Sequence, residues 1–90
     1  MTTIGLDSRP HLRRGVRLTY DKTRQTHVLL FPEGVLVPNK TAASVLELCD
    51  GVVTVAEIAA LLGEKYEGVR AEDVRSVLTR LEDRRVVEWT

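Results

Sequence analysis

The chain has 90 residues, of which 43% are apolar and 29% are charged. This length supports one small domain with a single modest core and excludes a second catalytic domain. The 13 basic and 13 acidic residues give a formal net charge of zero, which argues against a protein that binds nucleic acid or membranes through bulk charge.

The charges are unevenly divided along the chain. Residues 1–40 contain seven basic and three acidic residues, a balance of +4, and residues 41–90 contain six basic and ten acidic residues, a balance of −4. A basic part beside an acidic part predicts either complementary charges across the fold or a charged patch that selects a partner.

The sequence indicates a reducing compartment. Cys49 is the only cysteine, so no intramolecular disulfide can form. No window has the roughly 18 to 20 apolar residues of a membrane span, and the first residues lack the apolar stretch of a secretory signal. We therefore expect a soluble, cytoplasmic protein.

Three strands are predicted in the first half of the chain. Residues 1–14 are mostly polar, so we expect an irregular N-terminal lead before a single domain at residues 15–90. Val16, Leu18 and Tyr20 alternate with polar residues, which is typical of a strand with one buried face. The turn after this strand spans residues 21–26.

The second strand contains four consecutive apolar residues, Val28–Phe31, so both faces of the sheet need cover there. The N-terminal segment, a second copy or a partner would supply that cover, and the strand suits a homodimer interface or a swapped hairpin. Pro32-Glu33-Gly34 predicts a tight turn, and Val35–Val37 a third strand that Pro38 ends. In a meander this third strand is an uncharged edge, open to an added strand.

Three helices are predicted in the second half. Asn39 or Thr41 caps the first, which Asp50-Gly51 ends, and Thr54 with Glu57 forms a capping box for the second, which Gly63 ends. Apolar residues at helical spacing predict a third helix over about 71–84, and residues 86–89 form a final strand. The fold is therefore α+β and winged helix-turn-helix-like, with a three-stranded antiparallel β-meander followed by three α-helices.

The residue pattern gives no sign of catalysis, of a metal or of a cofactor. His11, His27 and Cys49 stand in three different elements without the paired spacing of a metal site. No serine has the local signature of a nucleophile, and no glycine-rich phosphate loop is present. A winged-helix nucleic-acid binder is the alternative function, but the third helix carries four acids, which phosphates would repel.

Peptide capture uses several of these features together. A guest strand would pair with the edge strand, and its side chains would drop between that strand and the third helix. We expect at least two of the three apolar helix residues in the predicted site to serve mainly in the core. The predicted peptide-binding residues are Val35, Leu36, Val37, Val74, Arg75, Leu78 and Leu81.

A set of short segments points to one family. They are Arg9-Pro10, Gly15-Val16-Arg17-Leu18, Pro32-Glu33-Gly34, Asn39 with Thr41-Ala42, Leu46-Glu47-Leu48-Cys49-Asp50-Gly51, Thr54-Val55-Ala56-Glu57-Ile58 and Asp73-Val74. Together they resemble the PqqD family, whose members are peptide chaperones of pyrroloquinoline quinone (PQQ) biosynthesis. The resemblance covers about residues 9–89, and its most specific piece is the Leu-Cys-Asp-Gly segment followed by Thr-Val-Ala-Glu-Ile.

The resemblance implies a non-catalytic RiPP recognition element that binds the precursor peptide PqqA and presents it to the radical SAM enzyme PqqE. It also implies that the peptide lies as an added strand against Val35–Val37 and against the helix residues Val74–Leu81. The sequence departs from the family pattern at one place. Where relatives often have Arg-Gly after the third helix, this chain has Arg84-Arg85, so its helix must end without glycine.

Overall fold

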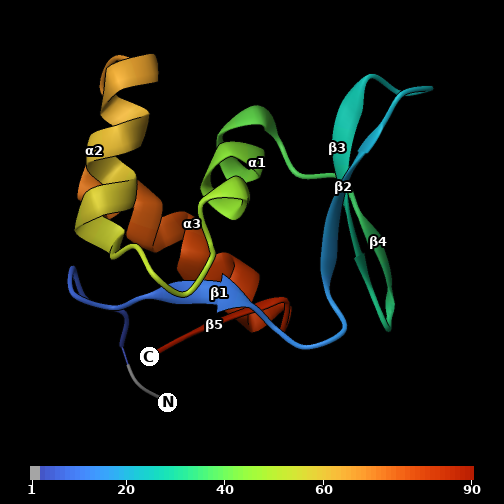
Figure 1. Ribbon diagram of the computed structural model, residues 1–90, viewed down its shortest axis with the longest axis horizontal. Coiled ribbons are helices and arrows are strands. Elements are labelled where there is room, and N and C mark those ends of the chain that lie inside the picture. The colour runs from blue at the N-terminus through green and yellow to red at the C-terminus, as the bar shows by residue number, and fades with distance from the viewer. Residues whose placement is uncertain (1–2) are drawn as a thin grey trace.

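The computed structural model describes residues 3–90, which form two small sheets and three helices (Figure 1). The elements in chain order are β1 (Pro10–Leu12), β2 (Arg17–Asp21), β3 (Thr26–Phe31), β4 (Gly34–Leu36), α1 (Lys40–Glu47), α2 (Val55–Lys65), α3 (Ala71–Asp83) and β5 (Val87–Trp89). The predicted meander followed by three helices is confirmed.

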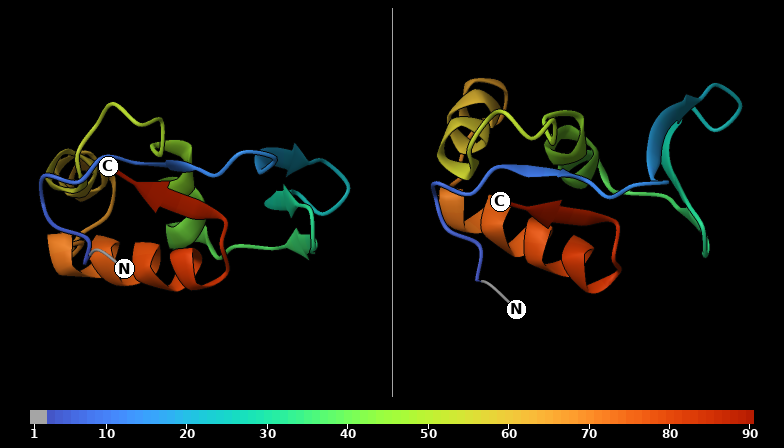
Figure 2. Two further views of the ribbon diagram at one scale, coloured as in Figure 1. Left: turned by 90° about the horizontal axis from the view of Figure 1, so that it is seen from below. Right: turned by 60° about the horizontal axis from the view of Figure 1, so that its bottom comes forward.

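The meander is an antiparallel sheet with the order β2-β3-β4, which stands to one side of the helices (Figures 1 and 2). Its register places Leu18 opposite Leu29 and Leu29 opposite Leu36, on the face that turns toward the core. Side chains alternate along a strand, so Leu30 and Val35 point to the outer face. They are 37% and 59% exposed, and the outer face of this apolar strand is only partly covered.

Local side-chain chemistry sets where the first two helices begin. The Asn39 side chain accepts a hydrogen bond from the Ala42 N–H at 2.8 Å, so Asn39 caps α1. The predicted capping box of α2 is confirmed, because the Glu57 N–H donates to Thr54 Oγ1 and the Thr54 N–H to Glu57 Oε1.

The predicted ends of these two helices were less accurate. Helix α1 ends at Glu47, before Asp50-Gly51, because the Asp50 carboxylate accepts the Val52 and Val53 N–H groups and forms a turn instead. Helix α2 continues past Gly63 to Lys65. Gly63 adopts an ordinary helical conformation there, since a single glycine in a helix costs only about 1 kcal/mol.

A second sheet ties the two ends of the chain together. Strand β1 pairs antiparallel with β5, with His11 opposite Glu88. The predicted irregular lead therefore contains a strand, which short-range patterns do not reveal because its partner lies at the other end of the sequence. Met1 and Thr2, which the same prediction covered, lie outside the described residues.

The segment before β1 runs along the helices as a strap. The carbonyl groups of Leu6 and Ser8 accept hydrogen bonds from the Ala56 and Val55 N–H groups, at 3.1 and 3.0 Å. These are donors that the first turn of α2 would otherwise leave unpaired. The strap thus completes the N-terminal cap of α2 from a distant part of the sequence.

Helix α3 ends without glycine, as the sequence requires. Arg85 adopts a left-handed conformation with φ of 60°, and the Val86 N–H donates to the Leu81 carbonyl at 3.2 Å. This is the turn that glycine ordinarily makes at a helix end. It directs the chain back into β5.

One apolar core lies between α3, the other two helices and the inner face of the three-stranded sheet. Figure 2 shows α3 running beneath α1 and α2 with β1 and β5 beside it. The buried cluster is formed by Ile4, Val16, Leu29, Val45, Leu46, Cys49, Val55, Ile58, Leu62, Val74, Val77, Leu78, Leu81, Val86 and Val87. Among residues 3–90, no helix combines the length and the apolar character needed to cross a membrane.

Candidate functional site

A groove lies between the edge strand β4 and helix α3. Its cavity volume is about 200 Å³, and its walls combine apolar side chains with two arginines. The lining residues are Leu36, Val37, Pro38, Asn39, Ala42, Val77, Arg80, Leu81 and Arg84. An open strand edge beside an apolar groove is the arrangement that strand addition requires.

The hairpin register decides which backbone groups of β4 are open. Phe31 lies opposite Gly34 across a two-residue turn. In the alternative antiparallel pattern the N–H of residue 32 would have to donate a hydrogen bond, and Pro32 has none. Phe31 and Gly34 therefore form the hydrogen-bonded pair. Hydrogen-bonded pairs alternate along an antiparallel ladder, so Leu36 is bonded to Leu29 and Val35 is not bonded to Leu30. The backbone groups of Val35 and Val37 therefore point outward.

The predicted peptide-binding residues do not all lie together. Leu36, Val37 and Leu81 line the groove, and Val35 lies beside it at the edge. Val74 and Leu78 are fully buried in the core, in line with the expectation that two of the helix residues mainly fill it.

Arg75 lies on another side of α3. Its Nε donates to the Ile4 carbonyl at 3.1 Å and so holds the strap. Nine residues separate Arg75 from Arg84, which is about 180° around a helix of 3.6 residues per turn. Arg75 therefore cannot contact a guest that occupies the groove.

The sequence prediction missed three groove residues of α3, namely Val77, Arg80 and Arg84. Val77, Arg80 and Arg84 are spaced by three and four residues and share one face of α3 with Leu81. That spacing is visible in the sequence. What the sequence could not show is which face of α3 turns toward β4, because several positions of the helix are apolar on adjoining faces.

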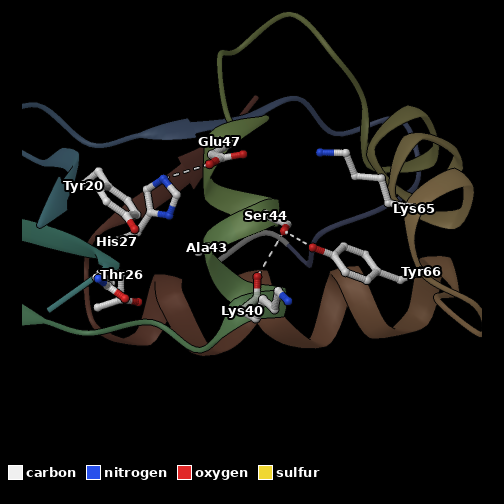
Figure 3. Close-up of a pocket in the computed structure, with 10 residues that line it drawn as sticks. Tyr20, Thr26, His27, Lys40, Ala43, Ser44, Glu47, Lys65 and Tyr66 are labelled. Atoms are coloured by element: carbon white, nitrogen blue, oxygen red, sulfur yellow. Dashed lines mark hydrogen bonds and ion pairs between the residues drawn. The ribbon is translucent and has the colours of Figure 1, made fainter. Parts of the chain in front are cut away.

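A second hollow of about 430 Å³ lies on the other side of α1, between the β2-β3 hairpin and the end of α2. Figure 3 shows His27 pointing to Glu47, the Ser44 hydroxyl meeting the Tyr66 hydroxyl, and Lys65 reaching over from α2. His27 Nε2 lies 2.9 Å from Glu47 Oε1, and the two hydroxyl oxygens lie 3.2 Å apart. None of the residues that line this hollow lines the groove.

The titrating groups with clear shifts serve the structure. Burial, with a smaller effect of the Asp50 charge, raises the pKa of the Cys49 thiol to about 12, so this thiol stays protonated and is a poor nucleophile. The backbone N–H groups of Val52 and Val53 lower the pKa of Asp50, and the Thr54 N–H lowers that of Glu57. Within residues 3–90, no three His, Cys, Asp or Glu side chains form a group that could hold a metal ion.

Several curated proteins similar to this chain are named PqqA binding proteins. A PqqA binding protein of Rhodopseudomonas palustris strain TIE-1 is 47% identical over 81 residues, which cover 90% of this chain and 79% of the relative. One from Pseudomonas paraeruginosa is 40% identical over 89 residues and covers 99% of this chain and 96% of its own. A bifunctional coenzyme PQQ synthesis protein C/D of Methylorubrum extorquens is 43% identical over 82 residues, which are 22% of that longer protein.

The fold has a solved counterpart. The NMR solution structure of the PqqD truncation of Methylobacterium extorquens PqqCD superposes with a TM-score of 0.70 at 40% identity, covering 88% of this chain and 87% of that one. It is described as a functional, stand-alone RiPP recognition element, so this structure and the PqqA binding proteins are named for recognition and binding, which is a non-catalytic role. A family model described as coenzyme PQQ synthesis protein D (PqqD) matches residues 26–87. The chain belongs to the PqqD family.

Proposed function

We propose that this chain is a peptide chaperone of PQQ biosynthesis that binds a PqqA-type precursor peptide as an added strand on β4. One observation carries the proposal: the backbone groups of Val35 and Val37 point outward, and the groove lies beside them. The guest backbone would continue the sheet, and its inward side chains would enter the groove against Leu36, Val77 and Leu81. Val74 and Leu78 pack into the core and hold α3 in place beside the groove.

The proposal continues to the enzyme that modifies the peptide. We propose that the loaded chaperone presents the peptide to the radical SAM enzyme PqqE and performs no chemistry itself. The groove lies on one side of α1, so the hollow on the other side stays uncovered when a peptide is bound (Figure 3). A second protein can therefore contact the chaperone without displacing the guest.

Self-association is the third part of the proposal. The outer face of the three-stranded sheet carries Leu30 and Val35, which are 37% and 59% exposed. We propose that two copies pair weakly through this face, because apolar side chains gathered on one sheet face are more stable when covered.

Replacing Val35 by proline tests strand addition. The Val35 N–H is one of the open donors, so Val35→Pro removes a bond to the guest while leaving the β3-β4 ladder intact, and proline is tolerated on an edge strand. We expect a loss of about 1 kcal/mol, which raises the Kd about fivefold. The matched control is Val35→Ala, which keeps the N–H and should bind within about twofold of the original chain.

The measurement is an amide NMR titration of the labelled protein with the synthetic PqqA peptide of Rhodopseudomonas palustris. Shifts should concentrate in residues 35–39 and in the groove face of α3. A folded Val35→Pro protein with unchanged affinity would exclude strand addition at this edge. If the peptide left the spectrum unchanged while a random DNA duplex moved the signals of Arg9 to Arg17, the nucleic-acid function would replace this proposal.

A further inference from the structure

Two arginines on the rim of the groove have no carboxylate partner among residues 3–90. Ion pairs within residues 3–90 join His11 to Glu88, Arg24 to Asp21 and His27 to Glu47. Arg80 and Arg84 line the groove, are exposed, and take part in none of these pairs. The groove therefore has two free guanidinium groups beside an apolar floor.

Nearby charges on α3 do not neutralise this rim. Glu82 is about 160° from Arg84 around the helix, whereas Asp83 is three residues from Arg80 and lies on the flank of its face, but it forms none of these ion pairs, and neither acid lines the groove. The helix C-terminus contributes about half a negative charge, which the two arginines exceed. The groove side of α3 is thus positive at this end, although residues 41–90 carry a net charge of −4.

The spacing of the two arginines matches that of an extended guest. Arg80 and Arg84 are one helical turn apart, about 6 Å along the axis. Side chains on one face of a strand repeat about every 6.8 Å. A guest strand that runs along the axis of α3 would bring two successive side chains of its inward face each within reach of one guanidinium group, and arginine binds carboxylates through a planar fork of donors.

We propose that Arg80 and Arg84 make the groove selective for a guest strand with a carboxylate at a position that faces α3, next to an apolar residue that fills the groove. This inference rests on the proposed function, because it assigns the chemistry of the peptide that this groove accepts. A nucleic-acid phosphate would also meet two arginines, but it would leave the apolar floor and the open edge of β4 unused. An acidic peptide uses all three.

A double-mutant cycle tests the selectivity. In the Rhodopseudomonas palustris PqqA peptide, each Asp and Glu is replaced singly by Asn or Gln, and the Kd is measured by calorimetry with the original chain, Arg80→Gln and Arg84→Gln. At least one peptide substitution should raise the Kd about two- to fivefold with the original chain and leave it nearly unchanged with one of the variants. The control is Arg14→Gln, which removes the same charge from an exposed position outside the groove.

Each result separates this inference from the proposed function. If every amide substitution is neutral, or costs the same with all four proteins, the peptide still binds and the proposed function stands, but the selectivity by Arg80 and Arg84 is wrong. If the unaltered peptide does not bind the original chain, both are wrong. If a DNA duplex binds and loses affinity equally in both groove variants, the arginines serve phosphate recognition and the inference is overturned.

Discussion

Arg85 adopts a left-handed backbone conformation, which residues other than glycine rarely adopt. Its φ is 60°, and this turn sends the chain from α3 into β5. A left-handed conformation costs about 1–2 kcal/mol for an ordinary residue because the Cβ atom approaches a carbonyl oxygen. The hydrogen bonds of the Arg85 and Val86 N–H groups to Glu82 and Leu81 offset part of this cost.

Replacing Arg85 by glycine should therefore stabilise the protein. Glycine relieves the strain but loses more entropy on folding, so we expect the free energy of unfolding to rise by about 0.5–1 kcal/mol and the Tm by about 4 °C. Urea unfolding followed by circular dichroism measures the change. Arg84→Gly, at a φ of −88°, is the matched control and should lower stability, because glycine brings no benefit there.

A gain from Arg84→Gly as large as that from Arg85→Gly would show that strain at residue 85 is not the cause. The comparison works because the two arginines are adjacent, carry the same charge and differ mainly in backbone conformation.

Residue-level signals in the sequence were reliable where they act over a few positions. Asn39 and Thr54 cap helices through backbone N–H groups three residues further along the chain, so their role follows from the sequence. Arg80 and Arg84 were missed because their role depends on which element packs against their face of α3. Arg75 was assigned to the peptide site for the same reason, although it holds the carbonyl of Ile4.

At the level of elements, the strap before β1 is the part that local patterns could not predict. It supplies the Leu6 and Ser8 carbonyl groups to the start of α2 and buries Ile4 in the core. Its partners lie about 50 to 70 residues further along the chain, and a polar segment of this kind has no periodicity. The strands of the meander were predictable because consecutive hairpins pair neighbours in the sequence.

Truncating Ile4 tests whether the strap is part of the folded core. Ile4 is 2% exposed, so Ile4→Ala should lower the free energy of unfolding by about 2 kcal/mol, whereas Leu6→Ala, at a residue that is 49% exposed, should cost less than about 0.5 kcal/mol. Both are measured by urea unfolding. Equal effects of the two substitutions would mean that the strap does not dock as described.

The Ile4→Ala substitution should lower the stability of the protein without changing its affinity for the peptide. The strap contacts the side of α3 that carries Arg75, whereas the groove lies on the side that carries Arg84. We therefore expect folded Ile4→Ala protein to bind the peptide with the affinity of the original chain.

At the level of the whole molecule, the sheet that stands beside the helices presents an edge and an outer face (Figure 1). Its edge at β4 faces the groove, and its outer face carries Leu30 and Val35, which stay partly exposed although Val28 on the same face is buried. The sequence predicted that the Val28–Phe31 strand needs cover on both sides. The structure gives the reason that one side remains open, because all three helices lie on the other.

The size of this outer face limits how tightly two copies can pair. Strands of five, six and three residues, with a rise of about 3.4 Å per residue and about 4.8 Å between strands, span roughly 230 Å². A stable interface needs about 800 Å² on each partner. The protein should therefore be monomeric at about 10 µM and form dimers only as its concentration approaches about 1 mM.

Sedimentation equilibrium over that concentration range tests the weak pairing. Leu30→Lys places a charge at the centre of the face and should abolish the dimer, whereas Leu61→Lys places the same charge at an exposed leucine of α2 and should leave it unchanged. Loss of the dimer in Leu61→Lys alone would move the interface to the helices. A dimer already present at about 10 µM would contradict the area argument, because only an exchanged hairpin buries enough surface for such affinity.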